Sequence, residues 1–242
     1  MIAQQLKSIY RDLSHAVDGL SFDPPTAYVY NPLTYARKPA EQYLERSGGN
    51  HKEVLFLGMN PGPWGMAQTG VPFGTVSFVR DWLGIEGPVG KPAREHPKRP
   101  IQGFAVQREE VSGSRLWGWA RDRFRSPDHF FQRFFVANYC PLVFMEASGR
   151  NRTPDKLPAA EQRELFRHCD RALRRVVKTL NPRLVVGIGK FAEDRAQSAL
   201  VDMDIRIGRI LHPSPASPAA NRGWSEQAER QLASLGIGVG NP

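Results

Sequence analysis

The sequence has 242 residues, of which 40% are hydrophobic and 24% are charged, as in ordinary globular proteins. Its 33 Lys and Arg residues outnumber 24 Asp and Glu residues, and the net charge of +9 favours polyanionic partners, nucleic acid first. Two cysteines, Cys140 and Cys169, cannot by themselves bind an iron–sulfur cluster or form a four-cysteine zinc site. They could form one disulfide, but nothing else indicates secretion, so we expect buried free thiols in a reducing compartment. No run approaches the ~20 apolar residues of a membrane span, and the N-terminus lacks a signal-peptide core.

Helical spacing of apolar residues begins near the N-terminus and predicts a helix over Ile2–Val17. Prolines then indicate an extended connection, and a second helix is expected over Ala40–Arg46. The clearest later helix has apolar residues from Leu165 to Leu180 and ends at Asn181-Pro182, because the residue before a proline disfavours helix. The stretch Glu86–Arg99 is rich in Pro, Gly and basic residues and is expected to be an exposed loop.

Four apolar runs indicate buried strands, since continuous apolar runs are typical of a parallel sheet that is covered on both faces. They are Val54–Leu57, Phe134–Ala137, Leu184–Ile188 and Ile205–Leu211. Because helical patterns separate them, we predict an α/β fold with three layers, α/β/α, around a central, mostly parallel four-stranded sheet. One domain over residues 1–242 is the simplest organisation.

A long loop follows the first predicted strand, over residues 58–74. Five glycines and three prolines in these seventeen residues cannot continue a strand or a helix. A loop directly after a buried parallel strand lies where open α/β sheets bind ligands. An ordinary turn with structural glycines is the alternative, although it does not explain why the loop also carries Asn60, Gln68 and Phe73.

A second loop follows the fourth predicted strand, from His212 to Asn221, and contains three prolines that stiffen it. Rigidity lowers the entropic cost when a loop enters a partner. His212 is either a catalytic group or a hydrogen-bonded structural residue, and its position on the same sheet edge as Asn60 favours the catalytic interpretation.

Asn138 follows the second predicted strand and is expected at the same sheet edge. Its amide offers both a donor and an acceptor, which suits the imide edge of a pyrimidine. A structural asparagine that caps the turn before Pro141 is the competing interpretation.

These segments together resemble the single-strand-selective monofunctional uracil-DNA glycosylases of the uracil-DNA glycosylase superfamily. Residues 58–74 match the family's first motif except at Trp64, where the family has Phe. Residues 212–215 and 221–224 are similar to its second motif, and residues 110–118 and 138–142 also resemble family segments. The similarity covers about residues 25–235. Ala216 departs from the Arg common in vertebrate relatives, which leaves the strength of duplex penetration and the strand preference open.

The resemblance implies an enzyme that flips uracil out of DNA and hydrolyses its N-glycosidic bond, leaving an abasic site. It implies that Asn60 holds the attacking water, and that His212 donates a hydrogen bond to uracil O2 as negative charge develops there. The Met59 backbone N–H is expected to help at the same oxygen.

The resemblance also implies the residues that bind the base. Phe73 stacks on it, Asn138 pairs with its imide edge, and Met66 belongs to the same pocket. Gly62 faces the pyrimidine 5-position and leaves space there, so 5-substituted uracils such as 5-hydroxymethyluracil are expected substrates. Without the motif match, core packing of Phe73 and turn geometry at Gly62 are the simpler interpretations.

DNA contacts are expected from the second loop and from basic residues. The predicted wedge and its flank comprise Pro213, Ser214, Pro215, Ala216, Ser217 and Arg222. Candidate phosphate contacts are the Lys91–Arg99 loop, Arg115, Arg121 and Arg123, for which a solvated charged surface is an equal alternative. Trp117 and Trp119 are more typical of core residues.

The partner is therefore expected to be uracil-containing DNA, single-stranded and double-stranded, with no membrane, no metal and no cofactor. No lysine matches a catalytic position, so no lyase step is expected, and the protein is predicted to be a monomer. It would act in the cytoplasm at the nucleoid in a bacterium or in the nucleus in a eukaryote.

Three alternatives stay open. One is a glycosylase of the same superfamily that acts on deaminated purines, xanthine or hypoxanthine. Another is a catalytically weak DNA-binding relative. The third is a nucleotide-binding protein, indicated only by the glycines within Val186–Lys190, which lack the spacing of a phosphate-binding motif.

Overall fold

The computed structural model describes residues 1–239 of the protein. The α-helices are α1 (Ile2–Asp18), α2 (Pro32–Tyr35), α3 (Arg37–Ser47), α4 (Met66–Thr69), α5 (Val76–Asp81), α6 (Val111–Phe124), α7 (Pro127–Arg133), α8 (Ala159–Leu180), α9 (Lys190–Ala199) and α10 (Trp224–Ser234). The strands are β1 (Thr26–Tyr30), β2 (Val54–Gly58), β3 (Phe134–Asn138), β4 (Val143–Glu146), β5 (Asn151–Arg152), β6 (Leu184–Ile188) and β7 (Arg206–Ile210). Short 3₁₀ turns lie at Gly103–Ala105, Pro154–Lys156 and Ala220–Arg222.

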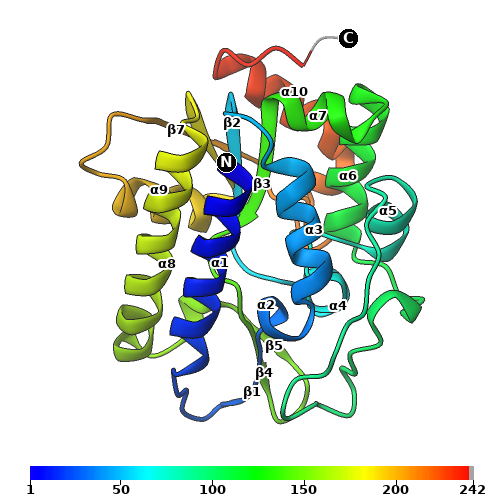
Figure 1. The fold of residues 1–242 in the computed structure, drawn as a ribbon, viewed down its shortest axis with the longest axis vertical. Coiled ribbons are helices and arrows are strands. Elements are labelled where there is room, and N and C mark those ends of the chain that lie inside the picture. Colours follow the sequence, from blue (N-terminus) through cyan, green and yellow to red (C-terminus); the bar gives the residue numbers. More distant parts are fainter. Residues whose placement is uncertain (240–242) are drawn as a thin grey trace.

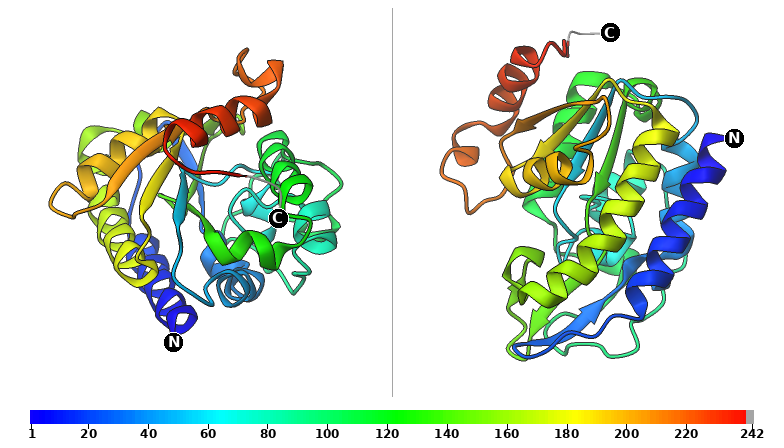
Figure 2. Two further views of the ribbon diagram at one scale, coloured as in Figure 1. Left: turned by 90° about the horizontal axis from the view of Figure 1, so that it is seen from above. Right: turned by 90° about the vertical axis from the view of Figure 1, so that its left-hand side faces the viewer.

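The central sheet has four parallel strands in the order β3-β2-β6-β7. The four predicted strands are confirmed, with ends that differ from the predicted ones by at most one residue. All five residues of β2 and of β6 are buried, as continuous apolar runs require when both faces of a sheet are covered. The predicted three-layer α/β fold is confirmed (Figures 1 and 2).

Alternate residues of β2 face the two helical layers. Leu57 lies beside Leu13 of α1 and Val176 of α8. Phe56 contacts Trp119 of α6 edge to face, and Trp119 in turn contacts Trp224 at the start of α10. Figure 2 shows the strands between α1 and α8 on one side and α10 on the other. Trp119 is 4% exposed and Trp117 is fully buried, so the prediction that both are core residues is confirmed.

The helices with the clearest apolar stripes are confirmed. Helix α1 spans Ile2–Asp18, α3 extends the predicted Ala40–Arg46 helix at both ends, and α8 begins before the first predicted apolar residue. Helix α8 ends where predicted, with Asn181 in the left-handed conformation and its N–H bound to the Val177 carbonyl. Helices α1 and α8 lie side by side along the sheet (Figure 1).

Sequence patterns missed a second sheet, in the order β1-β4-β5 and antiparallel, as well as several helices. Helix α9 buries only three alanines, so it has no large apolar residues at helical spacing. Helix α6 contains Gly113 and Gly118, which weaken helical propensity. Tertiary packing rather than local pattern stabilises these elements.

The order of the central sheet determines where a ligand can bind. Strand β3 follows β2 in the chain and lies beyond it at one edge of the sheet, whereas β7 follows β6 and lies at the other edge. The direction in which successive strands are added therefore reverses between β2 and β6. In open α/β sheets, ligands bind at such a reversal, beyond the carboxyl ends of the strands. Within residues 1–239, no helix is both long and apolar enough to cross a membrane. The one-domain organisation of residues 1–242 stays a prediction, and residues 240–242 lie outside the described structure.

Candidate active site

The loops that follow β2, β3 and β7 meet at one cavity of about 440 Å³. In the sheet, Gly58 pairs with Asn138, so the two loops that follow these residues leave the sheet side by side. The lining residues are Met59, Asn60, Pro61, Gly62, Pro63, Trp64, Phe73, Glu110, Ser112, Asn138, Asn151, Thr153, His212 and Ser214. The structure therefore brings together the residues predicted for catalysis and most of those predicted for base binding.

Asn60 is held by the segment between the two sheets. Its Nδ2 donates to the Leu142 carbonyl at 3.0 Å, while the Met59 carbonyl accepts from the N–H of Cys140 at 2.9 Å. Because Nδ2 faces Leu142, the Asn60 Oδ1 atom is left to accept a hydrogen bond within the cavity. An amide oxygen in this position can orient a water molecule, although it is a weak base.

Asn138 lies at the end of β3, and a contact with Met66 holds its side chain in place. Its Nδ2 donates to Sδ of Met66 at 3.3 Å. Met66 is 3% exposed and does not line the cavity, so it lies behind Asn138. Position 58 requires glycine, because a Cβ there would collide with Oδ1 of Asn138 and would lie 2.6 Å from Cε2 of Phe73.

Phe73 presents its ring to the cavity from a constrained backbone. Its φ of +55° is unfavourable for an aromatic residue, which indicates that the surrounding structure enforces it. Nearby anchors include Trp117, whose Nε1 donates to the Pro72 carbonyl at 3.1 Å, and the close approach of Gly113 to the Phe73 carbonyl. Phe73 is 6% exposed and lines the cavity, so it packs in the core and also offers a face to a ligand.

His212 also lines the cavity and lies beside this ring, with ring centroids 6.2 Å apart. The backbone N–H of Ser214 donates to Nδ1 of His212 at 3.1 Å, so Nδ1 is an acceptor and the ring proton of the neutral form is on Nε2. Burial lowers the pKa of His212 from 6.5 to about 4. The imidazole is therefore neutral near pH 7 and has one N–H to donate.

The loop after β7 is held in shape by Arg115 of α6. Its Nη1 donates to the carbonyls of Pro213 and Ser214, and its Nη2 donates to Oδ1 of Asn221 at 2.8 Å. Asn221 also donates to the Pro215 carbonyl at 2.9 Å. Arg115, a predicted phosphate contact, thus binds the predicted wedge instead of presenting a free guanidinium.

The predicted wedge residues differ in exposure. Pro215, Ala216 and Arg222 are exposed, Ser214 and Ser217 are half-buried, and Pro213 is buried. The other two predicted phosphate contacts on α6 are in ion pairs, Arg121 with Asp122 and Arg123 with Glu229.

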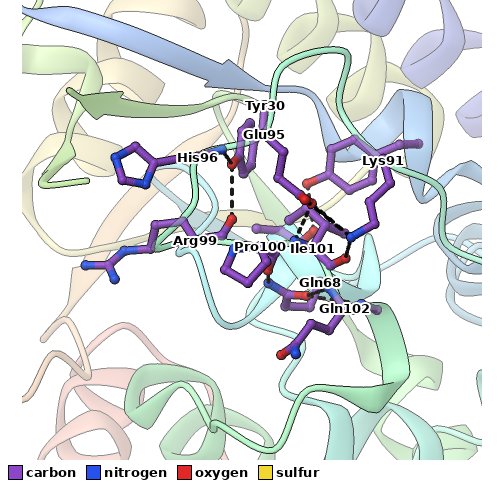
Figure 3. Close-up of polar contacts among 12 residues, drawn as sticks. Tyr30, Gln68, Lys91, Glu95, His96, Arg99, Pro100, Ile101 and Gln102 are labelled. Atoms are coloured by element: carbon purple, nitrogen blue, oxygen red, sulfur yellow. Dashed lines mark hydrogen bonds and ion pairs between the residues drawn. The ribbon is translucent and has the colours of Figure 1, made fainter. Parts of the chain in front are cut away.

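Gln68 connects the loop after β2 to the basic loop that follows α5, as Figure 3 shows. Gln68 is fully buried, and its Nε2 donates to the carbonyls of Pro63 and Pro100, while its Oε1 accepts from the N–H groups of Gln102 and Gly103. These bonds keep the loop over Pro61–Gly65 in place beside the cavity.

The stretch Glu86–Arg99 is a loop, as predicted, but it is anchored to the small sheet (Figure 3). The Tyr30 hydroxyl donates to the Arg99 carbonyl at 3.0 Å and accepts from the N–H of His96 at 2.6 Å. Lys91 donates to the Ile101 carbonyl at 2.5 Å and pairs with Glu95.

Some lining residues were missed by sequence reasoning. Glu110 and Ser112 stand at the start of α6 within a segment that resembles the family, but nothing local indicates that they face the cavity. Asn151 belongs to β5 of the small sheet, which the patterns did not reveal, and Thr153 follows that strand.

Two other sequence interpretations bear on ligands. The glycines within Val186–Lys190 serve packing: a Cβ on Gly187 would collide with the Glu193 backbone, and one on Gly189 would lie 3.2 Å from Cβ of His212. Cys140 and Cys169 are buried free thiols, as predicted. Within residues 1–239, no group of three or more His, Cys, Asp or Glu is arranged to hold a metal ion.

A cavity at the carboxyl ends of parallel strands, lined by an aromatic ring and a few polar side chains, defines a ligand-binding α/β protein, and comparison with known proteins assigns the family. Residues 46–233 match the family model described as the uracil DNA glycosylase superfamily. The chain belongs to this superfamily, which confirms the family recognised from its motifs.

Similar proteins cover most of the chain. The chain is 50% identical over 227 residues to the mouse protein named single-strand selective monofunctional uracil DNA glycosylase, covering 93% of this chain and 81% of that one. It is 51% identical over 220 residues to the bovine protein of the same name, covering 90% and 81%. The crystal structure of wild-type Pedobacter heparinus SMUG2 superimposes with a TM-score of 0.66 at 16% identity, covering 94% of this chain and 97% of that one, which supports the fold.

Proposed function

We propose that this protein is a monofunctional uracil-DNA glycosylase, which flips uracil out of DNA and hydrolyses its N-glycosidic bond to leave an abasic site. The observation that carries this proposal is the meeting of Asn60, Phe73, Asn138 and His212 around one cavity. Relatives named for this activity are about 50% identical over nine tenths of the chain.

The cavity fits recognition of a flipped pyrimidine. Extrusion costs a few kcal/mol and is easiest for mismatched or single-stranded bases. Phe73 supplies a stacking face worth about 1–3 kcal/mol but little selectivity. Asn138 supplies the selectivity, because its amide pairs with the imide edge of uracil, whereas cytosine presents the reversed donor and acceptor pattern and leaves polar groups unpaired.

The same residues support hydrolysis. As the bond between C1′ and N1 breaks, its electron pair passes to the uracil ring, and Nε2–H of His212 stabilises the charge at O2. A preorganised donor of this kind is worth roughly 3–4 kcal/mol. Water held by Asn60 then bonds to the cationic C1′ and releases a proton to solvent, while the departing uracil anion takes up a proton. Because the sugar becomes cationic first, orientation by an amide suffices.

DNA contacts are proposed beside the cavity. Pro215 and Ala216 are exposed at the end of the loop that would enter the duplex, and Arg222 is exposed beyond it. Trp64 lines the cavity, and the guanidinium carbons of Arg108 and Arg99 lie 4.7 and 5.5 Å from its ring centroid. An aromatic ring with two cations beside it suits a nucleotide next to the target, through stacking and phosphate contact.

We further propose that both single-stranded and double-stranded DNA are substrates, that the protein acts as a monomer, and that 5-substituted uracils are accepted. Its place would be with DNA, at the nucleoid of a bacterium or in a eukaryotic nucleus.

Single-turnover excision tests the proposal, with uracil placed in a single strand, opposite guanine and opposite adenine. Release of uracil that leaves an unbroken, alkali-labile strand is expected. Negligible uracil release with strong xanthine or hypoxanthine release would assign the chain to deaminated purines. Equal background release by wild type and Asn60→Ala would make it a DNA-binding relative.

A further inference from the structure

An asparagine amide can read two opposite hydrogen-bond patterns, because a half-turn about its last side-chain bond exchanges the carbonyl oxygen with the amino group. In one orientation, Oδ1 of Asn138 accepts from N3–H of uracil while Nδ2 donates to O4. In the other, Nδ2 donates to N3 of cytosine while Oδ1 accepts from the 4-amino group. Selection of uracil, which rests on the proposed function, therefore requires that the Asn138 amide be held in one orientation.

Met66 holds the Asn138 amide from the side away from the cavity. Its Sδ atom accepts a hydrogen bond from Nδ2 of Asn138 at 3.3 Å. A thioether sulfur can accept a hydrogen bond but cannot donate one. A turned amide would place Oδ1 against the sulfur, acceptor against acceptor, and would lose this bond. The sulfur therefore distinguishes the two orientations of the amide.

The sulfur is itself fixed, so it cannot follow a turning amide. Met66 is the first residue of α4 and is 3% exposed. The Tyr35 hydroxyl donates to the carbonyl of Ala67 at 2.7 Å, and Gln68 bonds the same helix to the carbonyls of Pro63 and Pro100. A buried side chain next to such anchors has few alternative rotamers, because protein interiors are closely packed.

The remaining edge of the amide is open to a base. Asn138 is half-buried and lines the cavity, whereas Met66 does not line it. One N–H of Nδ2 is used by the sulfur, which leaves Oδ1 and the second N–H for a ligand. The side chain thus offers a base one acceptor and one donor, in the order that Met66 sets.

We propose that Met66 is a positioning residue for base selectivity, whose thioether holds the Asn138 amide in the orientation that reads uracil and opposes the half-turn that cytosine requires. The half-turn exchanges an N–H···S bond for a contact between two acceptors. Loss of one hydrogen bond between neutral groups corresponds to about a 3- to 10-fold change in relative affinity. Because Met66 acts through Asn138, its effect falls on selectivity and not on the bond-breaking step.

Two matched probes measure this selectivity. They are single-stranded oligonucleotides that carry one 2′-fluoro-2′-deoxyuridine or one 2′-fluoro-2′-deoxycytidine, because the fluorine destabilises the cationic sugar and slows cleavage. Competition fluorescence anisotropy gives the ratio of the two Kd values for each protein. Met66→Leu removes the acceptor and keeps an apolar side chain of similar volume. The preference for the uracil probe is expected to fall about 3- to 10-fold, while single-turnover uracil release changes less than threefold. An unchanged or increased preference overturns the proposal.

Two controls separate positioning from a general loosening of the fold. Met145→Leu changes a fully buried methionine of β4 that does not line the cavity, and it is expected to keep the wild-type preference. In Asn138→Ala the amide is absent, so adding Met66→Leu is expected to leave the preference of that variant unchanged. A preference that falls equally in Met145→Leu, or that falls further when Met66→Leu is added to Asn138→Ala, contradicts the proposal.

Uracil release by wild type is measured in parallel as the test of the proposed function itself. A wild type that releases no uracil refutes that function. A wild type that releases uracil, together with a Met66→Leu variant of unchanged preference, refutes only the role of Met66. If Met66→Leu does not fold, biosynthetic replacement of methionine by norleucine exchanges the sulfur for a methylene group. The preference is then expected to fall in wild type and not in Asn138→Ala, and the opposite result overturns the proposal.

Discussion

The backbone N–H of Ser214 donates a hydrogen bond to Nδ1 of His212 over 3.1 Å, and this contact determines which nitrogen of the imidazole can act. Nδ1 is occupied as an acceptor, so the proton of the neutral ring is on Nε2. Since the two residues belong to one proline-rich loop, the segment proposed to enter DNA also orients the group proposed to stabilise the leaving base.

Replacing His212 tests its role in the chemical step. His212→Ala is expected to slow single-turnover cleavage by roughly 10²–10³-fold, because a preorganised donor to the developing anion is lost. DNA affinity is expected to stay near that of wild type, as measured by fluorescence anisotropy with a non-cleavable uracil analogue. Lost affinity with an unchanged cleavage rate would refute the assignment.

The lowered pKa of His212 predicts how its contribution depends on pH. With the pKa lowered to about 4, the folded protein keeps this ring neutral at pH 5 and above, whereas an unperturbed imidazole gains its proton near pH 6.5. The ratio of wild-type to His212→Ala cleavage rates is therefore expected to stay constant from pH 8 to pH 5. Taking the ratio cancels the titration of other groups, including Glu110. A ratio that changes with a midpoint near 6.5 would contradict a buried neutral imidazole.

The same shift predicts an effect on stability, with a definite sign. The unfolded chain binds a proton at His212 below about pH 6.5 and the folded chain only below about pH 4, so this residue destabilises the fold as pH falls between these values. His212→Gln is expected to lose less thermal stability than wild type on going from pH 7 to pH 4.5. Differential scanning fluorimetry measures this, and an equal loss in both proteins would count against the shift.

Asn60 is expected to matter for rate and not for binding. Its Nδ2 is used by the Leu142 carbonyl, which leaves Oδ1 to orient water. Asn60→Ala is expected to reduce the single-turnover rate by about 10²-fold, in the range of catalytic proton-transfer and orientation effects. Equilibrium binding of uracil-containing DNA is the control, and a variant that cleaves at the wild-type rate would exclude this role.

Arg115 is expected to affect duplex substrates most. Arg115→Ala removes the contacts to Pro213, Ser214 and Asn221 that hold the loop, so ordering this loop in a duplex costs more entropy. We expect about a tenfold loss of kcat/KM for uracil in a duplex and less than threefold in a single strand. Arg121→Ala is the matched control, because Arg121 lies on the same helix and pairs with Asp122. Equal losses on both substrates would show that Arg115 supports the cavity in general.

The cation–aromatic cluster predicts a salt effect. Arg108→Gln is expected to weaken single-stranded DNA binding and to reduce the slope of log K against log salt by about 0.7, the value for one phosphate contact on a single strand. Arg167→Gln is the control of equal charge, since Arg167 is exposed on α8 and pairs with Glu164. An identical slope in both variants would indicate that Arg108 contributes only general charge.

Local patterns predicted much of the fold and of the site. Strands β2 and β6 were visible because strands buried on both faces are continuous apolar runs, and α1 and α8 because each buries one stripe against the sheet. Helix α9 and the small sheet were not visible, since three buried alanines and strands of two to five residues make no periodic signal.

The sequence by itself determined which loops carry the site, because a glycine- and proline-rich segment directly after a buried strand can only lie at the sheet edge. Only the tertiary structure decided how each side chain is used. Met66 lies behind Asn138, Arg115 holds the predicted wedge, and Glu110 lies against Gly62 and Gly65. Each of these contacts joins residues far apart in the chain. The partner, the direction and the pKa of each side chain therefore depend on how the strands and helices pack, and no local pattern contains that information.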